Sequence, residues 1–443
     1  MRQPAYSSGM RTFFMIWFGQ MVSTIGSAMT TFAITIWLWQ ATGQATSLAL
    51  VSFFSLLPSI VITALAGTVV DRSNRKFLMM LGDTIAVLST VGILLLLLTN
   101  HLQIWHFYVR GAINGAFSEI QTLAYSASIT MLVPKQQYTR ASSMNSCLHY
   151  GSIIVAPALA GVLYPSIGLL GIGLIDMVTF AIAISTVFKA RIPQPVASES
   201  PKSEKVSLRK RWQFLQEMAF GFQYILARPG MLAVLAFGAL FWLAHDIGGA
   251  IYSPMILARS GNDATVLGNI SAAAGFGGVM GAVLLSVWGG FHRRIDGFLL
   301  GMVGAGISKI IFGFGQTPLI WIPAQFCSSL NFPVLGSSED AIWLSKVKPD
   351  VQGRVFATRS VSVQIVSAIA VLIGGILADK IFEPAMMPGG SLALIFAPIF
   401  GTGSGAGIAL LYVLSSICLL LVGLSGYAIE TLRNVEKLVP DSQ

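Results

Sequence analysis

Several ionisable side chains lie inside long apolar segments of the sequence, where charged groups are rare. Among them are Asp83, Arg110, Glu119, His149, Asp176, Asp246 and Lys309. A charge in the hydrocarbon region of a membrane costs about 3 kcal/mol or more unless it is paired or meets water, so such residues commonly handle a proton, an ion or a substrate. Arg110, Glu119, Asp176 and Asp246 are therefore candidates for proton coupling or substrate binding.

The positions of these residues separate their expected roles. Arg110 and Glu119 are nine residues apart, which is about 180° round a straight helix, so only one of them is expected to face a cavity. Asp176 is expected to help its helix pack. Asp83 lies near a cytoplasmic helix end and is expected to join a charge network there. Asp246 is the candidate proton site in the second half of the chain.

The composition places these residues in a membrane. Of the 443 residues, 54% are hydrophobic and only 10% are charged, whereas a soluble domain carries about 25% charged residues. The net charge of +9 does not indicate a nucleic-acid partner. The cations gather in short loops between apolar segments, which is typical of the cytoplasmic face of a membrane protein.

Twelve apolar segments are long enough to cross a bilayer as helices. They lie near residues 12–40, 47–70, 77–98, 103–130, 142–164, 168–188, 230–258, 264–290, 295–315, 318–340, 355–380 and 405–428. With an even number of spans, both chain ends lie on one side, and Lys and Arg are concentrated in the loops of that side. The sequence predicts a multi-pass protein of the cell membrane with both termini in the cytoplasm.

The longest hydrophilic stretch, residues 189–229, divides the chain into halves at 1–188 and 230–443. It begins with a segment rich in Pro and Ser and continues as an amphipathic helix near 208–227. The apolar side chains at helical spacing in this helix are Trp212, Leu215, Ala219, Phe222 and Leu226. Because Arg209, Lys210 and Arg211 precede them, we expect this linker helix to lie on the inner leaflet.

The two halves also resemble each other in sequence. The matching pairs, all at an offset of about 214 to 219 residues, are 41–49 with 259–267, 133–140 with 347–354, Gly67 with Gly281, and Gly161 with Gly375. Parallel repeats of this kind build many transporters, with the substrate site between the repeats. The predicted fold is an all-α membrane protein with twelve transmembrane helices, in two six-helix halves related by a parallel pseudo-two-fold repeat.

The loop between the second and third apolar segments carries a family signature. It reads Gly67-Thr-Val-Val-Asp71-Arg72-Ser-Asn-Arg75-Lys76, which resembles the G-x-x-x-D-R-x-x-R-K motif of major facilitator superfamily transporters. Asp71 lies at the negative carboxyl end of a helix and needs a positive partner. Arg354 and the amino end of the eleventh helix are candidates on the same face. We expect a conformational latch made of Gly67, Asp71, Arg72, Arg75, Lys76 and Arg354, and the resemblance implies that it stabilises the outward-open state.

The fifth apolar segment carries a second signature. Gly151, Pro157 and Gly161 are similar to the antiporter motif G-x-x-x-G-P-x-x-G-G, with Ala156 and Ala160 where glycines are usual. Over about residues 12–430 the chain resembles the drug:proton antiporter-3 branch of the superfamily, which includes macrolide-efflux-like proteins and a siderophore exporter. Since these antiporters often carry an Arg in the outer part of the fourth helix, the resemblance implies a proton-transfer role for Arg110.

The function expected from these observations is export of amphipathic, drug-like small molecules by proton antiport with alternating access. The alternatives are a dedicated exporter of a siderophore, lipid or metabolite, an uptake symporter, a channel or receptor, and an intramembrane enzyme. The sequence contains no H-E-x-x-H, G-x-S-x-G or P-loop motif, so we expect neither catalysis nor ATP-driven transport. No cofactor and no metal are expected. The expected partners are a small-molecule substrate, protons and lipid, and the chain is expected to act as a monomer.

Overall fold

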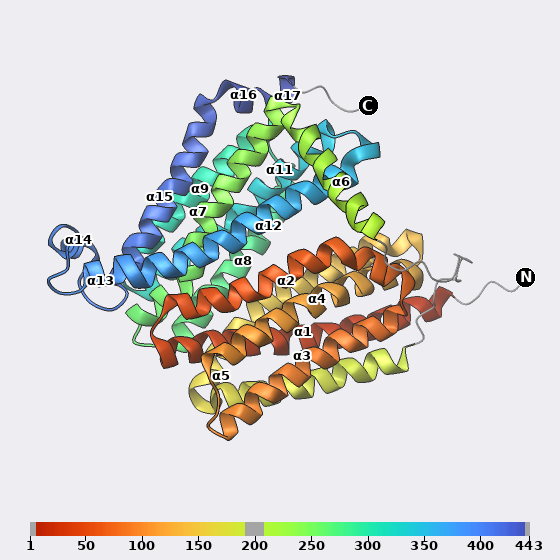
Figure 1. Cartoon of the computed structure of the whole chain (residues 1–443), viewed down its shortest axis with the longest axis horizontal. Helices are drawn as coiled ribbons and strands as arrows, with labels where there is room; N and C mark the ends of the chain where they lie inside the picture. Colours follow the sequence, from red (N-terminus) through yellow and green to blue (C-terminus); the bar gives the residue numbers. More distant parts are fainter. Residues whose placement is uncertain (1–5, 191–207, 439–443) are drawn as a thin grey trace, which may run out of the picture. The chain divides into compact units, whose positions relative to one another are not determined.

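The computed structural model describes residues 6–190 and 208–438, and every regular element within these ranges is a helix (Figure 1). The side chains at 6–9, 64–72, 130, 135, 139, 149 and 208–215 lie outside the description. The helices follow the apolar segments of the sequence, so the predicted all-α membrane class is confirmed.

Five helices make up the first part of the chain. They are α1 (Tyr6–Thr42), α2 (Ala45–Arg72), α3 (Arg75–Leu98), α4 (Ile104–Leu132) and α5 (Tyr138–Lys189), with a short 3₁₀ turn, η1 (Lys135–Gln137), before α5. Helix α5 covers two predicted spans, 142–164 and 168–188. These are joined at Gly168, whose φ of 60° and ψ of −166° are not helical. Only glycine adopts this backbone conformation readily, so the chain turns there without a loop.

The later part of the chain begins with the linker helix α6 (Leu208–Leu226). Its long helices are α7 (Pro229–Arg259), α8 (Ala264–Trp288), α9 (Arg294–Phe314), α10 (Pro318–Leu330), α11 (Phe332–Lys346), α12 (Gln352–Leu377) and α15 (Ala406–Ala428). The short elements are η2 (Pro349–Val351), the π-helical turn η3 (Ala378–Phe382), α13 (Glu383–Met386), α14 (Ala393–Phe400), α16 (Glu430–Arg433) and α17 (Val435–Leu438).

Nine helices of the described ranges are long and apolar enough to cross a membrane. The difference from the twelve predicted spans has a physical reason at each place. Helix α5 contains two of the predicted spans, which meet at the kink at Gly168 with no loop between them. Helix α4 is more polar because it contains Arg110, Asn114 and Glu119. The predicted span 318–340 is divided at Asn331 into α10 and α11, and Pro333 follows as the second residue of α11.

The chain divides into two compact units. The first comprises Met1–Gly43, Leu50–Ser200 and Asp263–Ala272, and the second comprises Gln44–Ala49, Pro201–Asn262 and Ala273–Gln443. Residues 44–49 thus belong to the second unit and residues 263–272 to the first, although each segment comes from the other half of the sequence. The boundaries 1–188, 189–229 and 230–443 stay a prediction.

The first unit has an apolar core between α1, α3, α4 and α5. Its members include Phe13 of α1, Met79 of α3, Ala124 of α4 and Val187 of α5, and all four side chains are fully buried. Helices α1 and α5 approach closely at Gly19, where an added Cβ would overlap the Thr186 hydroxyl.

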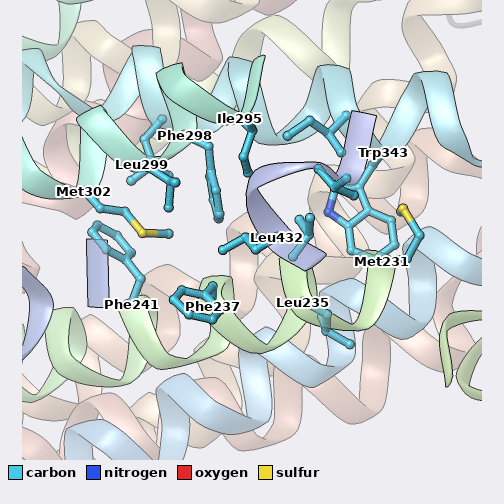
Figure 2. Packing of buried hydrophobic residues seen from close by; sticks show 14 of the residues in the cluster. Met231, Leu235, Phe237, Phe241, Ile295, Phe298, Leu299, Met302, Trp343 and Leu432 are labelled. Atoms are coloured by element: carbon cyan, nitrogen blue, oxygen red, sulfur yellow. The ribbon is translucent and has the colours of Figure 1, made fainter. Parts of the chain in front are cut away.

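The core of the second unit lies mainly between α7 and α9. Figure 2 shows Phe237 and Phe241 of α7 near Phe298, Leu299 and Met302 of α9. Trp343 of α11 and Leu432 of α16 complete the same cluster. These large apolar side chains fix the positions of α7 and α9, which carry the ionisable groups of this unit.

In each unit a glycine lets two helices approach closely. In the first unit an added Cβ at Gly115 of α4 would overlap the carbonyl of Ser55 in α2. In the second unit an added Cβ at Gly281 of α8 would overlap the carbonyl of Leu330 in α10. Residues 115 and 330 are 215 apart in sequence, within the repeat offset, whereas residues 55 and 281 are 226 apart. The two close approaches therefore do not lie at equivalent positions of the repeat.

The linker helix α6 packs against α12 and presents a second, exposed face (Figure 1). Ile225 is buried in the core of the second unit, and the Thr358 hydroxyl lies 3.4 Å from the carbonyl oxygen of Met218. On the predicted apolar face, Phe222 is 43% and Leu226 is 59% exposed, and Ala219 is exposed too. Trp212 and Leu215 lie among the side chains that the structure does not describe. Placement of this face on the inner leaflet stays a prediction.

Candidate functional site

A polar cavity of about 370 Å³ lies inside the first unit. Its wall is formed by side chains of α1, α2, α3, α4 and α5, and most of them carry a hydroxyl, an amide or a charge. Four ionisable groups line it: Asp83, Arg110, Glu119 and Asp176. Three of the four sequence-predicted coupling residues are therefore brought together.

Asp176 joins three helices at the cavity wall. It lies on α5 and is only 3% exposed. The Ser27 hydroxyl of α1 donates to Oδ1 at 3.0 Å, and the Thr90 hydroxyl of α3 lies 3.2 Å from Oδ2. Gly26 allows this approach, because an added Cβ there would lie 3.2 Å from Asp176 Oδ1 and would overlap the Thr179 hydroxyl. The packing role expected for Asp176 is visible in these bonds, and the residue also faces the cavity.

Arg110 reaches the same cavity from α4. Its Nε atom is buried and has no hydrogen-bond partner among the described residues. Its charge interacts with that of Asp176. One turn on, Asn114 accepts a hydrogen bond from the Ser89 hydroxyl at 3.1 Å. The site therefore holds a guanidinium and a carboxylate near each other, and the two groups do not form a salt bridge with each other.

Asp83 differs from its expected role. It is 5% exposed, lines the cavity, and accepts hydrogen bonds from Gln20 Nε2 at 2.9 Å and Gln121 Nε2 at 2.5 Å. Gly82 lets Gln121 approach, since an added Cβ would lie 2.8 Å from its side chain. The expectation of a cytoplasmic charge network is wrong, because amide groups from α1 and α4 surround this carboxylate.

Glu119 also lines the cavity, so the expectation that only one of Arg110 and Glu119 would face it is wrong. The wall includes residues from several sides of α4, and long side chains reach round the helix. Within the described residues, Glu119 makes no hydrogen bond and no ion pair. Asp83 and Asp176, by contrast, both accept hydrogen bonds from neighbouring side chains.

The second unit has its own buried ionisable cluster. Asp246 of α7 accepts a hydrogen bond from the Ser367 hydroxyl of α12 at 2.5 Å. Lys309 of α9 is 6% exposed, and its Nζ lies 3.3 Å from the Tyr412 hydroxyl of α15. The charges of Asp246 and Lys309 interact. His245 stacks on a neighbouring aromatic ring, and its Nδ1 has no partner among the described residues.

One ion pair was not found by sequence reasoning. Arg359 of α12 binds buried Glu339 of α11 at 2.9 Å and exposed Asp340 at 2.7 Å. Its guanidinium also lies 5.5 Å from the Trp343 ring. The signal was present, because Arg359 falls inside the predicted span 355–380 and Glu339 inside 318–340.

The cations of the signature loop bind helix ends within the first unit. Arg75 donates to the carbonyl of Ala127 at 2.6 Å, and Lys76 Nζ donates to those of Phe188 and Ala190 at 2.7 and 2.9 Å. These contacts complement the negative carboxyl ends of α4 and α5. The side chains of Gly67, Asp71 and Arg72 lie outside the description.

The second unit repeats this arrangement. Arg294 donates to the carbonyl of Ala341 at 3.1 Å, and Arg293 donates to that of Arg433 at 2.7 Å. Arg354, the remaining residue of the predicted latch, has its guanidinium 5.4 Å from the Phe220 ring of α6. The latch stays a prediction.

The helix-five signature lies within α5. Gly151 has open space at its Cβ position, and Pro157 is inside the helix. Ala156 and Ala160, which replace the usual glycines, are fully buried. The antiporter role of Gly151, Pro157 and Gly161 stays a prediction. Within the described residues, no group of three or more His, Cys, Asp or Glu side chains could hold a metal ion.

A family model described as Major Facilitator Superfamily matches residues 16–255, which is more than half of the sequence. The chain belongs to the Major Facilitator Superfamily. As a member of the Major Facilitator Superfamily it is a multi-pass membrane transporter and not an enzyme.

Two proteins with sequences similar to this chain are named as efflux proteins. The chain is 29% identical to Macrolide efflux protein A of Streptococcus pyogenes, over 85% of this chain and 91% of the relative. It is 21% identical to the Multidrug efflux pump Tap of Mycolicibacterium fortuitum, over 82% of this chain and 88% of the relative.

Solved structures share the superfamily fold. A bacterial homologue of the human lysosomal transporter Spinster matches with a TM-score of 0.70 and 16% identity over 99% of both chains. The nucleoside transporter NupG matches with a TM-score of 0.68 and 11% identity, over 94% of this chain and 99% of NupG. At these identities the likeness concerns the fold alone.

Proposed function

We propose that this protein exports amphipathic, drug-like small molecules, macrolides among them, by proton antiport. The direction and the substrate class are supported by the two efflux relatives, each of which the chain matches over most of its length. The observation that carries the proposal is the cavity of the first unit, where Arg110, Asp176 and Glu119 meet inside membrane-length helices.

The cavity has the size and the lining of a binding site. Small-molecule sites commonly have volumes of about 300 to 1,000 Å³ and combine apolar surface with a few polar groups. Here about 370 Å³ is lined by Phe117, Phe180 and many polar side chains. An amphipathic molecule therefore finds both aromatic surface and hydrogen-bonding partners.

Asp176 is the proposed proton carrier. When it is ionised, Ser27 and Thr90 donate to it and the Arg110 charge stabilises it. When it binds a proton, that electrostatic stabilisation is lost and the Arg110 charge must be compensated by water. The net charge of the cavity also rises by one, which disfavours a positively charged substrate such as a protonated macrolide. Proton binding and substrate binding thereby act on the same charge balance, which is what antiport requires.

Asp246 is the corresponding candidate in the second unit. It has a hydroxyl donor from Ser367 and a nearby cation, Lys309, as Asp176 has Ser27 and Arg110. Protonation of either carboxylate would change the charge in the interior of its unit. Alternating access then follows if the two faces of the transporter open in different protonation states.

Transport into inside-out membrane vesicles tests the proposal. With an acidic lumen, labelled erythromycin should accumulate above the level in vesicles without the protein, which corrects for passive trapping of a weak base. Collapse of the proton gradient should remove the excess, whereas ATP depletion with the gradient clamped should not. Accumulation that follows ATP, or no excess for any compound of a drug panel, would overturn the proposal. A panel response restricted to one siderophore, lipid or metabolite would favour a dedicated exporter.

A further inference from the structure

We propose that Glu119 is the ammonium-binding group of the first-unit cavity, so that the site prefers substrates with a protonated amine. The inference rests on the proposed export function and adds the charge class of the substrate to it. It comes from comparing what each carboxylate of the cavity already binds.

The cavity carries an excess of acidic groups. Asp83, Glu119 and Asp176 line it, against the single guanidinium of Arg110. In a cavity inside a protein, charges interact more strongly than in bulk water, and such an excess raises the local concentration of cations. A positively charged ligand is therefore favoured over a neutral or an anionic one.

Two of the three carboxylates are satisfied by the protein itself. Asp83 accepts hydrogen bonds from Gln20 and Gln121, and Asp176 accepts one from Ser27 and lies 3.2 Å from the Thr90 hydroxyl. A ligand that bound either of them would share the carboxylate with these donors and would gain less than at a carboxylate without any. Neither Asp83 nor Asp176 is therefore the preferred acceptor for the ammonium group of a ligand.

Glu119 is the exception. Among the described residues nothing donates to it and no cation pairs with it. A partly buried carboxylate without a donor is costly, and a charge-assisted hydrogen bond from a ligand would remove that cost. The contact is therefore made only when a cation enters the cavity.

Arg110 does not compete for this role. It lies about 180° away round α4 from Glu119, and its charge interacts with that of Asp176. Helix α4 thus presents a cation on one side and a carboxylate on the other, within one cavity. Proton handling by Arg110 with Asp176 and substrate recognition by Glu119 are in this way assigned to different groups.

The surroundings fit the rest of an amphipathic base. Ser59 and Ser118 offer hydroxyls, and the rings of Phe117 and Phe180 offer apolar surface. Aromatic rings also stabilise ammonium groups through their π-electrons. The class of substrate is a bulky, apolar or hydroxylated molecule that carries one basic nitrogen.

A matched pair of substrates tests the proposal in vesicles that contain the full chain. Erythromycin carries a basic dimethylamino group, and its N-demethylated, N-acetylated derivative is neutral. For Glu119→Gln we expect kcat/KM for erythromycin to fall roughly tenfold, mainly through KM, because one charge-assisted hydrogen bond is lost. The neutral derivative should change by less than about twofold, since it never made that bond.

Two further variants serve as controls. Glu119→Asp keeps the charge and should keep a preference for erythromycin over the neutral derivative. Glu217→Gln on α6 removes one negative charge outside the cavity and should leave the preference unchanged. If Glu119→Gln does not reach the membrane, Glu119→Asp and Glu119→Ser are compared instead. The preference for erythromycin over the neutral derivative should persist in Glu119→Asp and be lost in Glu119→Ser, and equal preferences would contradict the proposal.

The outcomes separate this proposal from the function on which it rests. If the unmodified protein exports neither compound, the proposed function fails. If it exports both and Glu119→Gln lowers both equally, the function stands and Glu119 is no charge selector. A Glu119→Gln protein that transports erythromycin normally, or that loses only its dependence on the proton gradient, also overturns the inference.

Discussion

Arg110 lies in the wall of the first-unit cavity with few partners for its charge. Its Nε has no partner among the described residues, its charge interacts with Asp176, and it lines the cavity. A buried guanidinium with so little compensation is expensive to retain, which favours a functional role over a purely structural one. In the proposal, Arg110 is the group whose electrostatic environment changes when Asp176 binds or releases a proton.

Arg110→Ala is expected to abolish gradient-driven export, by at least about tenfold, while the protein still folds, because Asp176 loses its electrostatic partner. Arg110→Lys should rescue export only in part, since the planar, multidentate guanidinium is lost. The measurement is erythromycin accumulation in inside-out vesicles at matched protein levels. Unchanged export by Arg110→Ala would make Arg110 a structural charge and leave Asp246 as the proton candidate.

At the scale of the helix, close packing of α1 on α5 positions Asp176. The glycines of α1 that allow it, Gly19 and Gly26, face Thr186 and Thr179 of α5. The same packing brings the Ser27 hydroxyl to Asp176. The geometry of the cavity therefore depends on the contact between α1 and α5, where a Cβ on either glycine would overlap a threonine hydroxyl.

Gly19→Ala should lower stability by about 1 to 3 kcal/mol, because its Cβ would overlap the Thr186 hydroxyl. Adding Thr186→Ala to the same chain should restore most of this loss, since that hydroxyl bonds only within its own helix, to the Ala183 carbonyl at 2.7 Å. Gly92→Ala on α3 is the control, because no atom lies within 4 Å of its added Cβ. Thermal unfolding in detergent measures all four proteins. Equal melting temperatures for Gly19→Ala and Gly92→Ala would contradict the packing argument.

The helices were largely predictable from the sequence, and the contacts of the site were not. Length and hydropathy located the spans, because a membrane-crossing helix needs about 20 apolar residues. The direct junction of the two spans of α5 was not predictable in this way, since it depends on the non-helical backbone conformation of one glycine, Gly168. The rarity of charges identified Arg110, Glu119 and Asp176. Which of them are already hydrogen-bonded depends on neighbouring helices, and no sequence spacing reports that.

At the scale of the molecule, each unit contains, among its described residues, a carboxylate in a membrane-length helix with a hydroxyl donor and a nearby cation. These are Asp176 with Ser27 and Arg110, and Asp246 with Ser367 and Lys309. Each unit also has an arginine at the start of a helix that binds a backbone carbonyl of another helix, Arg75 of α3 in the first unit and Arg294 of α9 in the second. The two units thus share a structural plan but differ in detail, since the polar cavity of about 370 Å³ lies in the first.

The central claim is that export of substrate is coupled to an opposite flow of protons. It is tested most directly with the purified chain in liposomes that contain a pH-sensitive dye, with equal pH on both sides and no ATP. Addition of erythromycin outside should make the lumen alkaline faster than in protein-free liposomes or in liposomes with Arg110→Ala, because each molecule that enters is exchanged for protons that leave. If labelled erythromycin enters through the protein while the pH signal matches that of protein-free liposomes, transport is not coupled to protons and the account is contradicted.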